Sequence, residues 1–317
     1  MLVPLLLFCA TSLSVLWTGA SRAANGSSPG SLAELARGWM YALPLMAILL
    51  SHELGHVVAA RVHGVPASLP YFLPLPAVSP FGTMGAVIGM PERIRSRDAL
   101  LDIGAAGPLA GLVVALPVLA LGLSWSKVVA LGSGDYLLEG QSLLYLALKQ
   151  LVKGSIPPGH DVLLHPTATA GWVGLFVTMI NLVPWGQLDG GHVAFALLGP
   201  RQHRIARFVH RALLGFFLYN LAMFVGPVLL GTSTMPLFVA VENSLTWLVW
   251  YALLSLLGRT MGSEHPPCEP GALSPARRSV AVGCLALFVL SFMPTPLSKP
   301  APPPSAVAAR ATLPAVP

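Results

Sequence analysis

The chain has 317 residues, of which 55% are hydrophobic and only 9% are charged, with a formal net charge of +6. A soluble domain carries about a quarter charged residues, so this composition excludes an ordinary soluble domain and predicts an all-α integral membrane protein. Three scattered cysteines, Cys9, Cys268 and Cys284, exclude a disulfide framework and a thiolate metal site.

Hydropathy predicts about six to seven transmembrane helices. The predicted spans are 2–19, 39–60, 101–123, 166–184, 212–230, 235–257 and 280–293. The first could be a signal peptide, because small residues follow its apolar run, but no Lys or Arg precedes that run. We therefore expect a retained helix, and either alternative leaves Asn25 on the outer side. Glu242 falls inside the sixth span, where it marks an interface or a shorter span.

The second predicted span carries the motif H-E-x-x-H in His52, Glu53 and His56. Residues four apart share one face of a helix, so both imidazoles can reach a single metal ion while Glu53 points at a water on that metal. Because ionisable groups are costly in hydrocarbon, three within little more than one turn indicate function. The motif predicts a metalloprotease with one Zn²⁺ per chain, His52 and His56 as ligands and Glu53 as catalytic base.

The segment 82–90, which follows the motif after a proline-rich stretch, is too short to span a membrane as a helix. Its glycines and β-branched residues allow it to present a strand edge. We expect a short re-entrant or β-like loop near the active site. It either pairs with unwound substrate by strand addition or seals the cavity.

The distribution of basic residues predicts the orientation. Two loops carry four arginines each: Arg61, Arg93, Arg95 and Arg97 in one, and Arg201, Arg204, Arg207 and Arg211 in the other. By the positive-inside rule both motif-bearing helices end on the cytoplasmic side, of the inner membrane if the cell is bacterial. The basic charge thus indicates the lipid bilayer as partner and no nucleic acid. Leucines over 137–152 predict an amphipathic helix on the outer face.

A catalytic zinc needs a third protein ligand, and Asp189 is the best candidate. It follows Asn181, Pro184 and Gly186 at the end of the fourth predicted span. Proline and glycine break the helix there and can turn the carboxylate toward a neighbouring helix. Taken alone, this segment could equally be an interfacial loop with an incidental Asp.

The two motifs together resemble the site-2 protease family of intramembrane zinc metalloproteases, in the bacterial and chloroplast-like branch without a PDZ domain. His52, Glu53 and His56 match its first signature. Its second signature, [N/D]-x-x-P-x-x-x-L-D-G, is matched by Asn181, Pro184, Leu188, Asp189 and Gly190. Ala106-Gly107-Pro108 is similar to a third. The resemblance implies that Asp189 is the third zinc ligand, and that a histidine at the position of His192 can occur without being a ligand.

The inferred reaction is hydrolysis of peptide bonds within or near transmembrane segments of membrane-anchored proteins, as in regulated intramembrane proteolysis. Asn181 either hydrogen-bonds the substrate or the oxyanion, or is only structural. The alternatives are a zinc-binding pseudoprotease and a metal or ion transporter. We expect one membrane domain over 1–294 and a disordered Pro/Ala-rich tail over 295–317. The oligomeric state stays open.

Overall fold

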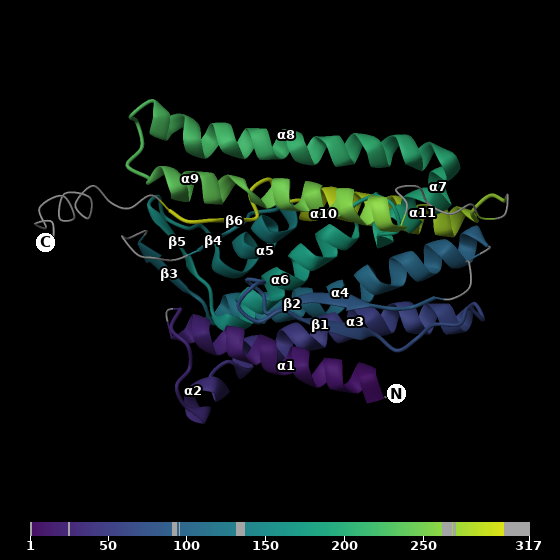
Figure 1. Ribbon diagram of the computed structural model, residues 1–317, viewed down its shortest axis with the longest axis horizontal. Helices are drawn as coiled ribbons and strands as arrows, with labels where there is room; N and C mark the ends of the chain where they lie inside the picture. The colour runs from purple at the N-terminus through teal and green to yellow at the C-terminus, as the bar shows by residue number, and fades with distance from the viewer. Residues whose placement is uncertain are drawn as a thin grey trace, which may run out of the picture.

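The computed structural model describes residues 2–24, 26–90, 94, 96–130, 137–261, 268 and 271–300. Over these residues the chain is mostly helical, as its composition predicts, and the long helices run between two ends of the molecule (Figure 1). The helices are α1 (Leu2–Ala23), α2 (Leu32–Ala36), α3 (Trp39–Val62), α4 (Arg97–Trp125), α5 (Leu143–Lys153), α6 (Pro166–Asn181), α7 (Asp189–Leu198), the 3₁₀ helix η1 (Gly199–Arg201), α8 (Gln202–Leu229), α9 (Leu237–Ser244), α10 (Thr246–Met261) and α11 (Pro275–Ser291).

Short antiparallel strand pairs connect the helices. The pairs are β1 (Tyr71–Pro74) with β2 (Thr83–Val87), β3 (Lys127–Ala130) with β5 (His160–Leu163), and β4 (Leu138–Glu139) with β6 (Leu297–Ser298). In the first pair Tyr71 lies opposite Val87, and the register shifts between Phe72 and Pro74. A proline has no N–H to donate, so a shift at Pro74 follows from its chemistry. Of the two forms expected near 82–90, the structure has the β-like one.

The predicted number of six to seven spans is not confirmed. Within the described ranges four helices are long and apolar enough to cross a membrane, and a bent pair makes a possible fifth. These are α1, α3, α4, the run Asp189–Leu229, and Leu237–Ser244 with Thr246–Thr260. Helices α6 and α11 have only 16 and 17 residues. At 1.5 Å per residue this is roughly 25 Å, against a hydrocarbon core of about 30 Å.

The bent pair α9–α10 corresponds to the predicted sixth span. Its two helices meet at an angle of 42°. Glu242 lies in α9 just before the bend, and its side chain, 52% exposed, forms an ion pair with Lys299 at 2.9 Å. The acid that fitted poorly inside an apolar span therefore has an exposed position and a basic partner.

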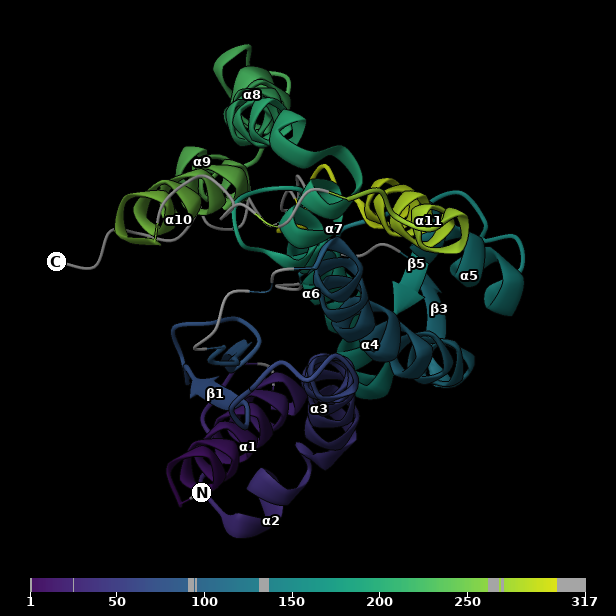
Figure 2. The same ribbon diagram turned by 90° about the vertical axis from the view of Figure 1, so that its right-hand side faces the viewer.

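Helices α3, α4 and α6 form the centre of the molecule (Figure 2). Twelve of the 16 residues of α6 are buried. Glycines let the backbones approach closely: a Cβ added at Gly55 of α3 would lie 2.5 Å from the Ala106 carbonyl oxygen of α4. Such small-residue contacts favour helix association in lipid, because the packing itself provides the attraction. The H-E-x-x-H residues lie on α3, within this centre.

Helix α1 packs on the hairpin β1–β2 as well as on α3. The Ser14 hydroxyl donates to the Gly82 carbonyl at 2.6 Å, and the Arg22 guanidinium donates to the Pro80 carbonyl at 2.7 Å. The rings of Phe8 and Phe72 meet edge to face, with centroids 5.3 Å apart. The first helix thus fixes the hairpin beside the core.

Two predicted boundaries differ from the structure. The amphipathic helix expected over 137–152 begins only at Leu143, because Leu138–Glu139 form a strand and the Gly140 N–H donates to the Pro296 carbonyl. Residues 295–300, predicted as part of a tail, pack on the fold: Thr295 donates to Asn220, and the Lys299 N–H to Asn243. Residues 301–317 lie outside the described residues, as do Asn25, Arg93 and Arg95 of the predicted orientation.

Candidate metal centre

The H-E-x-x-H residues lie in the middle of α3 and are buried. His52, Glu53 and His56 expose 4%, 8% and 7% of their surface. His52 and His56 are one turn apart on the same face, and their ring centroids are 4.9 Å apart. The helix therefore brings two imidazoles to one place inside an apolar bundle.

Asp189 reaches this place because the chain breaks after α6. Leu182 ends the helix, Pro184 cannot continue its hydrogen-bond ladder, and Gly186 takes a positive φ of 52°. The chain then restarts as α7 with Asp189 as its first residue. Gly190 lies directly on the Leu182 carbonyl, where any side chain would overlap it. The prolines and glycines thus give the turn that was predicted to direct this carboxylate toward a neighbouring helix.

Three ligand atoms converge. The Nε2 atoms of His52 and His56 are 3.2 Å apart, and Asp189 Oδ2 lies 3.2 Å from the first and 3.4 Å from the second. These residues form a group whose potential ligand atoms all lie within 4.8 Å of one another. The structure therefore brings together the three residues predicted as metal ligands.

Helix α4 orients the two rings. The His56 Nδ1–H donates to the Ile103 carbonyl at 2.7 Å, which leaves Nε2 to face the site. Gly107 lies under the His56 ring, so that a Cβ there would overlap it, and a Cβ at Gly111 would lie 3.2 Å from His52 Cβ. The glycine of Ala106-Gly107-Pro108 is thus needed to admit the His56 imidazole. The spacing of Gly104, Gly107 and Gly111 is the sequence signal for this close approach.

Asn181 is the last residue of α6 and lies beside the group. Its Nδ2 is 3.3 Å from His52 Nε2. His192 follows Asp189 on α7, and its Cβ lies beside Gly104. In the described part of the chain the metal-ligating group does not include His192. Among the other histidines, His63 binds Asp102, and His165 accepts the Thr167 N–H at the start of α6.

The donor set fits zinc. Two imidazole nitrogens and one carboxylate oxygen are common ligands of catalytic zinc, which keeps a further position open. With Nδ1 of His56 donating to Ile103, its Nε2 faces His52 and Asp189. Two imidazole nitrogens and one carboxylate oxygen that converge in a buried site suit a cation bound between them. The group can therefore hold one zinc ion.

A second polar cluster lies at the other end of α6. We call Glu139, Tyr145, Lys149 and Asp161 the distal cluster. The Lys149 amine pairs with Asp161 at 2.5 Å and Glu139 at 3.5 Å, and the Tyr145 hydroxyl donates to Glu139 at 2.7 Å. Burial raises the pKa of Glu139, an effect that the Tyr145 hydrogen bond partly offsets. Burial and the adjacent Glu139 raise the pKa of Tyr145.

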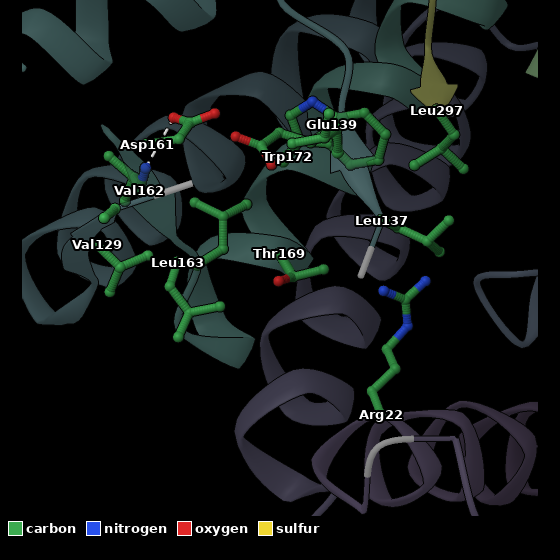
Figure 3. Close-up of a pocket in the computed structure, with 13 residues that line it drawn as sticks. Arg22, Val129, Leu137, Glu139, Asp161, Val162, Leu163, Thr169, Trp172 and Leu297 are labelled. Atoms are coloured by element: carbon green, nitrogen blue, oxygen red, sulfur yellow. Dashed lines mark hydrogen bonds between the residues drawn. The ribbon is translucent and has the colours of Figure 1, made fainter. Parts of the chain in front are cut away.

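The distal cluster borders a cavity of about 200 Å³. Figure 3 shows Arg22 on one side of this cavity, with Glu139, Asp161 and Trp172 on the other. Trp172 and Asn181 are nine residues apart on α6, or about 14 Å at 1.5 Å per residue. The cavity is therefore separate from the candidate metal centre.

The fold and the centre define a class: a helical protein with membrane-spanning helices and a buried His₂Asp site that suits zinc. Its sequence matches the model of peptidase family M50 over residues 40–224, and the chain belongs to this family. The matched region contains both predicted motifs and all three candidate ligands. The resemblance to zinc-dependent site-2 proteases is thereby confirmed.

Several relatives are named as zinc metalloproteases. Rice (Oryza sativa subsp. indica) has "Probable zinc metalloprotease EGY2, chloroplastic", 35% identical over 52% of this chain and 30% of the relative. "Probable zinc metalloprotease EGY1, chloroplastic" of Oryza sativa subsp. japonica is 33% identical over 79% of this chain and 39% of the relative. The corresponding EGY1 protein of Arabidopsis thaliana is 34% identical over 50% of this chain and 30% of the relative.

The chain thus spans about a third of the length of the curated relatives it matches. Their names give a chloroplast location and lend no support to the predicted bacterial inner membrane. No solved structure matches the chain.

Proposed function

We propose that this chain is an intramembrane zinc metalloprotease that hydrolyses peptide bonds within or near the membrane spans of anchored proteins, as in regulated intramembrane proteolysis. One observation carries the proposal: the ligand atoms of His52, His56 and Asp189 converge inside a bundle of apolar helices, next to Glu53. Membership of a peptidase family and the names of the relatives support hydrolysis as the reaction.

Each residue of the centre has a role in this reaction. His52, His56 and Asp189 would hold the zinc ion, which when bound would act as a Lewis acid that polarises a carbonyl and acidifies water. Glu53 holds the proton taken from the attacking water and returns it to the leaving amine. Its position next to His52 on α3 keeps it at the centre without making it a ligand. His52, Glu53 and His56 are buried and the Asp189 side chain is 16% exposed, so bulk water has little access to these groups.

Asn181 has a positioning role in substrate binding. Its amide nitrogen lies 3.3 Å from His52 Nε2. An N–H so close to the ligand atoms can donate to the scissile carbonyl as negative charge develops on its oxygen. The contact favours this role over the purely structural one.

The hairpin β1–β2 is the proposed contact for unwound substrate. Met84 and Val87 of β2 expose more than half of their side chains. Within the described residues β2 pairs with β1 alone, so its second edge can accept an extended peptide. Proline at Val87 or Ile88 should impair cleavage and leave zinc binding unchanged; cleavage at the wild-type rate would exclude the strand edge and favour a sealing loop.

The proposed topology has seven membrane passes, with α6 and α11 as short spans beside the longer helices (Figure 1). The arginine-rich segment at the start of α8 then faces the cytoplasm, and the distal cluster lies on the outer side. Labelling single cysteines in intact cells with an impermeant thiol reagent tests this. Labelling of cysteines introduced at 201–211, with no labelling at 158–160, would show that the topology is the reverse of the proposed one.

The decisive experiment compares wild type with Glu53→Gln in vesicles that contain a transmembrane peptide with Gly and Pro in its span. Glu53 moves a proton without binding the metal, so the variant should retain zinc and lose about 10²–10⁴-fold in cleavage rate. Undiminished cleavage by the variant would refute the role of Glu53. Zinc binding without cleavage by wild type would indicate a pseudoprotease, and zinc-dependent ion flux without cleavage would indicate a transporter.

A further inference from the structure

An ion-pair cluster joins α3, α4 and α11 at the end of the bundle near the metal centre. Asp102 of α4 accepts three hydrogen bonds from Arg277 of α11, two from Nε at 3.0 Å and one from Nη2 at 2.7 Å. Nη1 of the same guanidinium donates to Asp98 at 2.9 Å. Asp102 also accepts from Nε2 of His63, the residue that ends α3, at 2.8 Å. One carboxylate thus connects all three helices.

The turn of α4 that carries Asp102 also touches the ligands. The carbonyl of Ile103, the next residue, accepts the His56 Nδ1–H at 2.7 Å. A Cβ added at Gly104 would lie 2.8 Å from His192 Cβ and 3.2 Å from the Asp189 carbonyl oxygen. Residues 102–104 therefore contact α3 through His56 and α7 at Asp189. A shift of this turn moves two ligands relative to each other.

Helix α11 brings Arg277 to this turn. It begins at Pro275 with Ser274 as its N-cap. Ala281 and Cys284 are buried in the same apolar cluster as Leu101 and Val193, and Figure 2 shows α11 beside α7. The helix lies outside residues 40–224, the part that matches the family. The contact with the catalytic region is thus made by a segment that the motifs do not cover.

We propose that Arg277 is a positioning residue of the metal centre. It holds Asp102, and through the turn 102–104 it sets the direction of the Ile103 carbonyl and so the orientation of His56. This inference rests on the proposed zinc centre. A guanidinium suits the task because its planar fork fixes both carboxylate oxygens at once.

The proposal differs from a general stabilising effect. Arg277 and Asp98 are more than one-third exposed, and exposed ion pairs contribute little to folding stability. The orientation of His56 depends on the direction of the Ile103 carbonyl, and not on how much the ion pair adds to folding stability. Partners that orient a metal-bound histidine typically change metal affinity about 10–100-fold, and Arg277 acts on His56 only indirectly, through Asp102 and the Ile103 carbonyl.

The experiment measures Co²⁺ and Zn²⁺ affinity of the purified full chain, the visible absorption of the Co²⁺ form, and KM and kcat for a transmembrane peptide. The variants are Arg277→Gln and Arg277→Lys, with Arg278→Gln as the matched control, because Arg278 is the exposed neighbour on the same helix. We expect Arg277→Gln to weaken metal binding about threefold to tenfold, to shift the cobalt bands and to lower kcat more than it raises KM. Arg277→Lys keeps the charge without the fork, so its effect should be intermediate, and Arg278→Gln should match wild type.

Asp102→Asn should reproduce the effect of Arg277→Gln, and the double variant should add little to either. A lower melting temperature with unchanged cobalt bands and metal affinity would overturn the positioning role. If Arg277→Gln does not fold, the same measurements on Arg277→Lys decide. Failure of wild type to bind Co²⁺ or Zn²⁺ would instead refute the metal centre itself, so the two failures are distinguishable.

Discussion

Two buried polar clusters lie towards opposite ends of α6, and they differ in how their charges are satisfied. In the distal cluster the Lys149 amine pairs with the carboxylates of Glu139 and Asp161, and the Tyr145 hydroxyl donates to Glu139. At the metal centre, Nε2 of His56 faces Nε2 of His52 and Oδ2 of Asp189. Each group of the first cluster has a charged or hydrogen-bonding partner within that cluster, whereas the three potential ligand atoms of the second suit a cation bound between them.

This difference distinguishes buried polar groups that stabilise the fold from buried polar groups that can bind a metal. Buried charges are tolerated when they are paired and hydrogen-bonded, which the distal cluster achieves with elements from one connecting region of the chain. The metal centre instead uses three helices: α3 presents two histidine rings, α7 presents the Asp189 carboxylate, and α4 packs against the rings. Removing a cation should therefore affect only one of the two clusters.

The largest expected effect contrasts Asp189→Ala with Lys149→Met. Purified wild type should hold about one zinc per chain, and loss of a ligand should weaken zinc binding by at least about 100-fold. Lys149→Met should keep zinc but destabilise the protein by roughly 3–5 kcal/mol, because two carboxylates lose a buried partner. Metal analysis and thermal unfolding in detergent measure both. Full zinc occupancy in Asp189→Ala would remove the contrast between the clusters.

A smaller change tests the packing that supports the centre. Gly107→Ala places a methyl group on the His56 ring, so zinc affinity should fall and overpacking should cost about 1–3 kcal/mol. The matched control is Gly215→Ala on α8, where a Cβ would meet nothing within 4 Å. That variant should bind zinc as wild type does. Equal zinc affinity in the two variants would show that α4 does not position His56.

The sequence indicated the three residues of the metal centre in two ways. His52 and His56 were found from local spacing, because they lie four apart on one helix. Asp189 lies far along the chain, and it was predicted from the break at Pro184 and Gly186 together with the resemblance to the family. The contribution of α4 was only partly visible: Gly107 belongs to a recognised motif, but nothing in the sequence connects the Ile103 carbonyl to His56. Every residue has a backbone carbonyl, so the residue type at position 103 does not indicate that this carbonyl accepts a hydrogen bond from His56.

The distal cluster and the span count could not be predicted for a similar reason. The sequence shows that acids and lysines balance between 122 and 165, but not that Lys149 of α5 meets Glu139 of β4 and Asp161 of β5. Hydropathy likewise marks 166–184 as apolar without showing that the helix stops at Asn181. Apolar composition continues through a helix break, so windows of hydropathy overestimate the length of a short helix.

The smallest expected effect concerns the pH dependence of the distal cluster. Burial raises the pKa of Glu139 above its ordinary value of 4.5. The folded state thus favours the protonated carboxyl, and the associated stabilisation is fully present below the unfolded pKa and lost as the pH rises through the folded pKa. Glu139→Gln preserves the shape and the acceptor for Tyr145 but cannot ionise.

The melting temperature of wild type relative to Glu139→Gln should therefore fall as the pH rises from about 4 to 8, by about 3 °C per kcal/mol of lost stabilisation. Tryptophan fluorescence suits the measurement, since the chain has 7 tryptophans and Trp172 donates to Gly140, next to Glu139. Glu242→Gln is the control, because Glu242 is exposed on α9. The melting temperature of wild type relative to this variant should not fall as the pH rises. Zinc content should stay constant in both variants across this range of pH wherever wild type retains it. A pH-independent difference for Glu139→Gln would mean that the pKa of Glu139 is the same in the folded and unfolded states, and that Tyr145 and Lys149 offset the effect of burial.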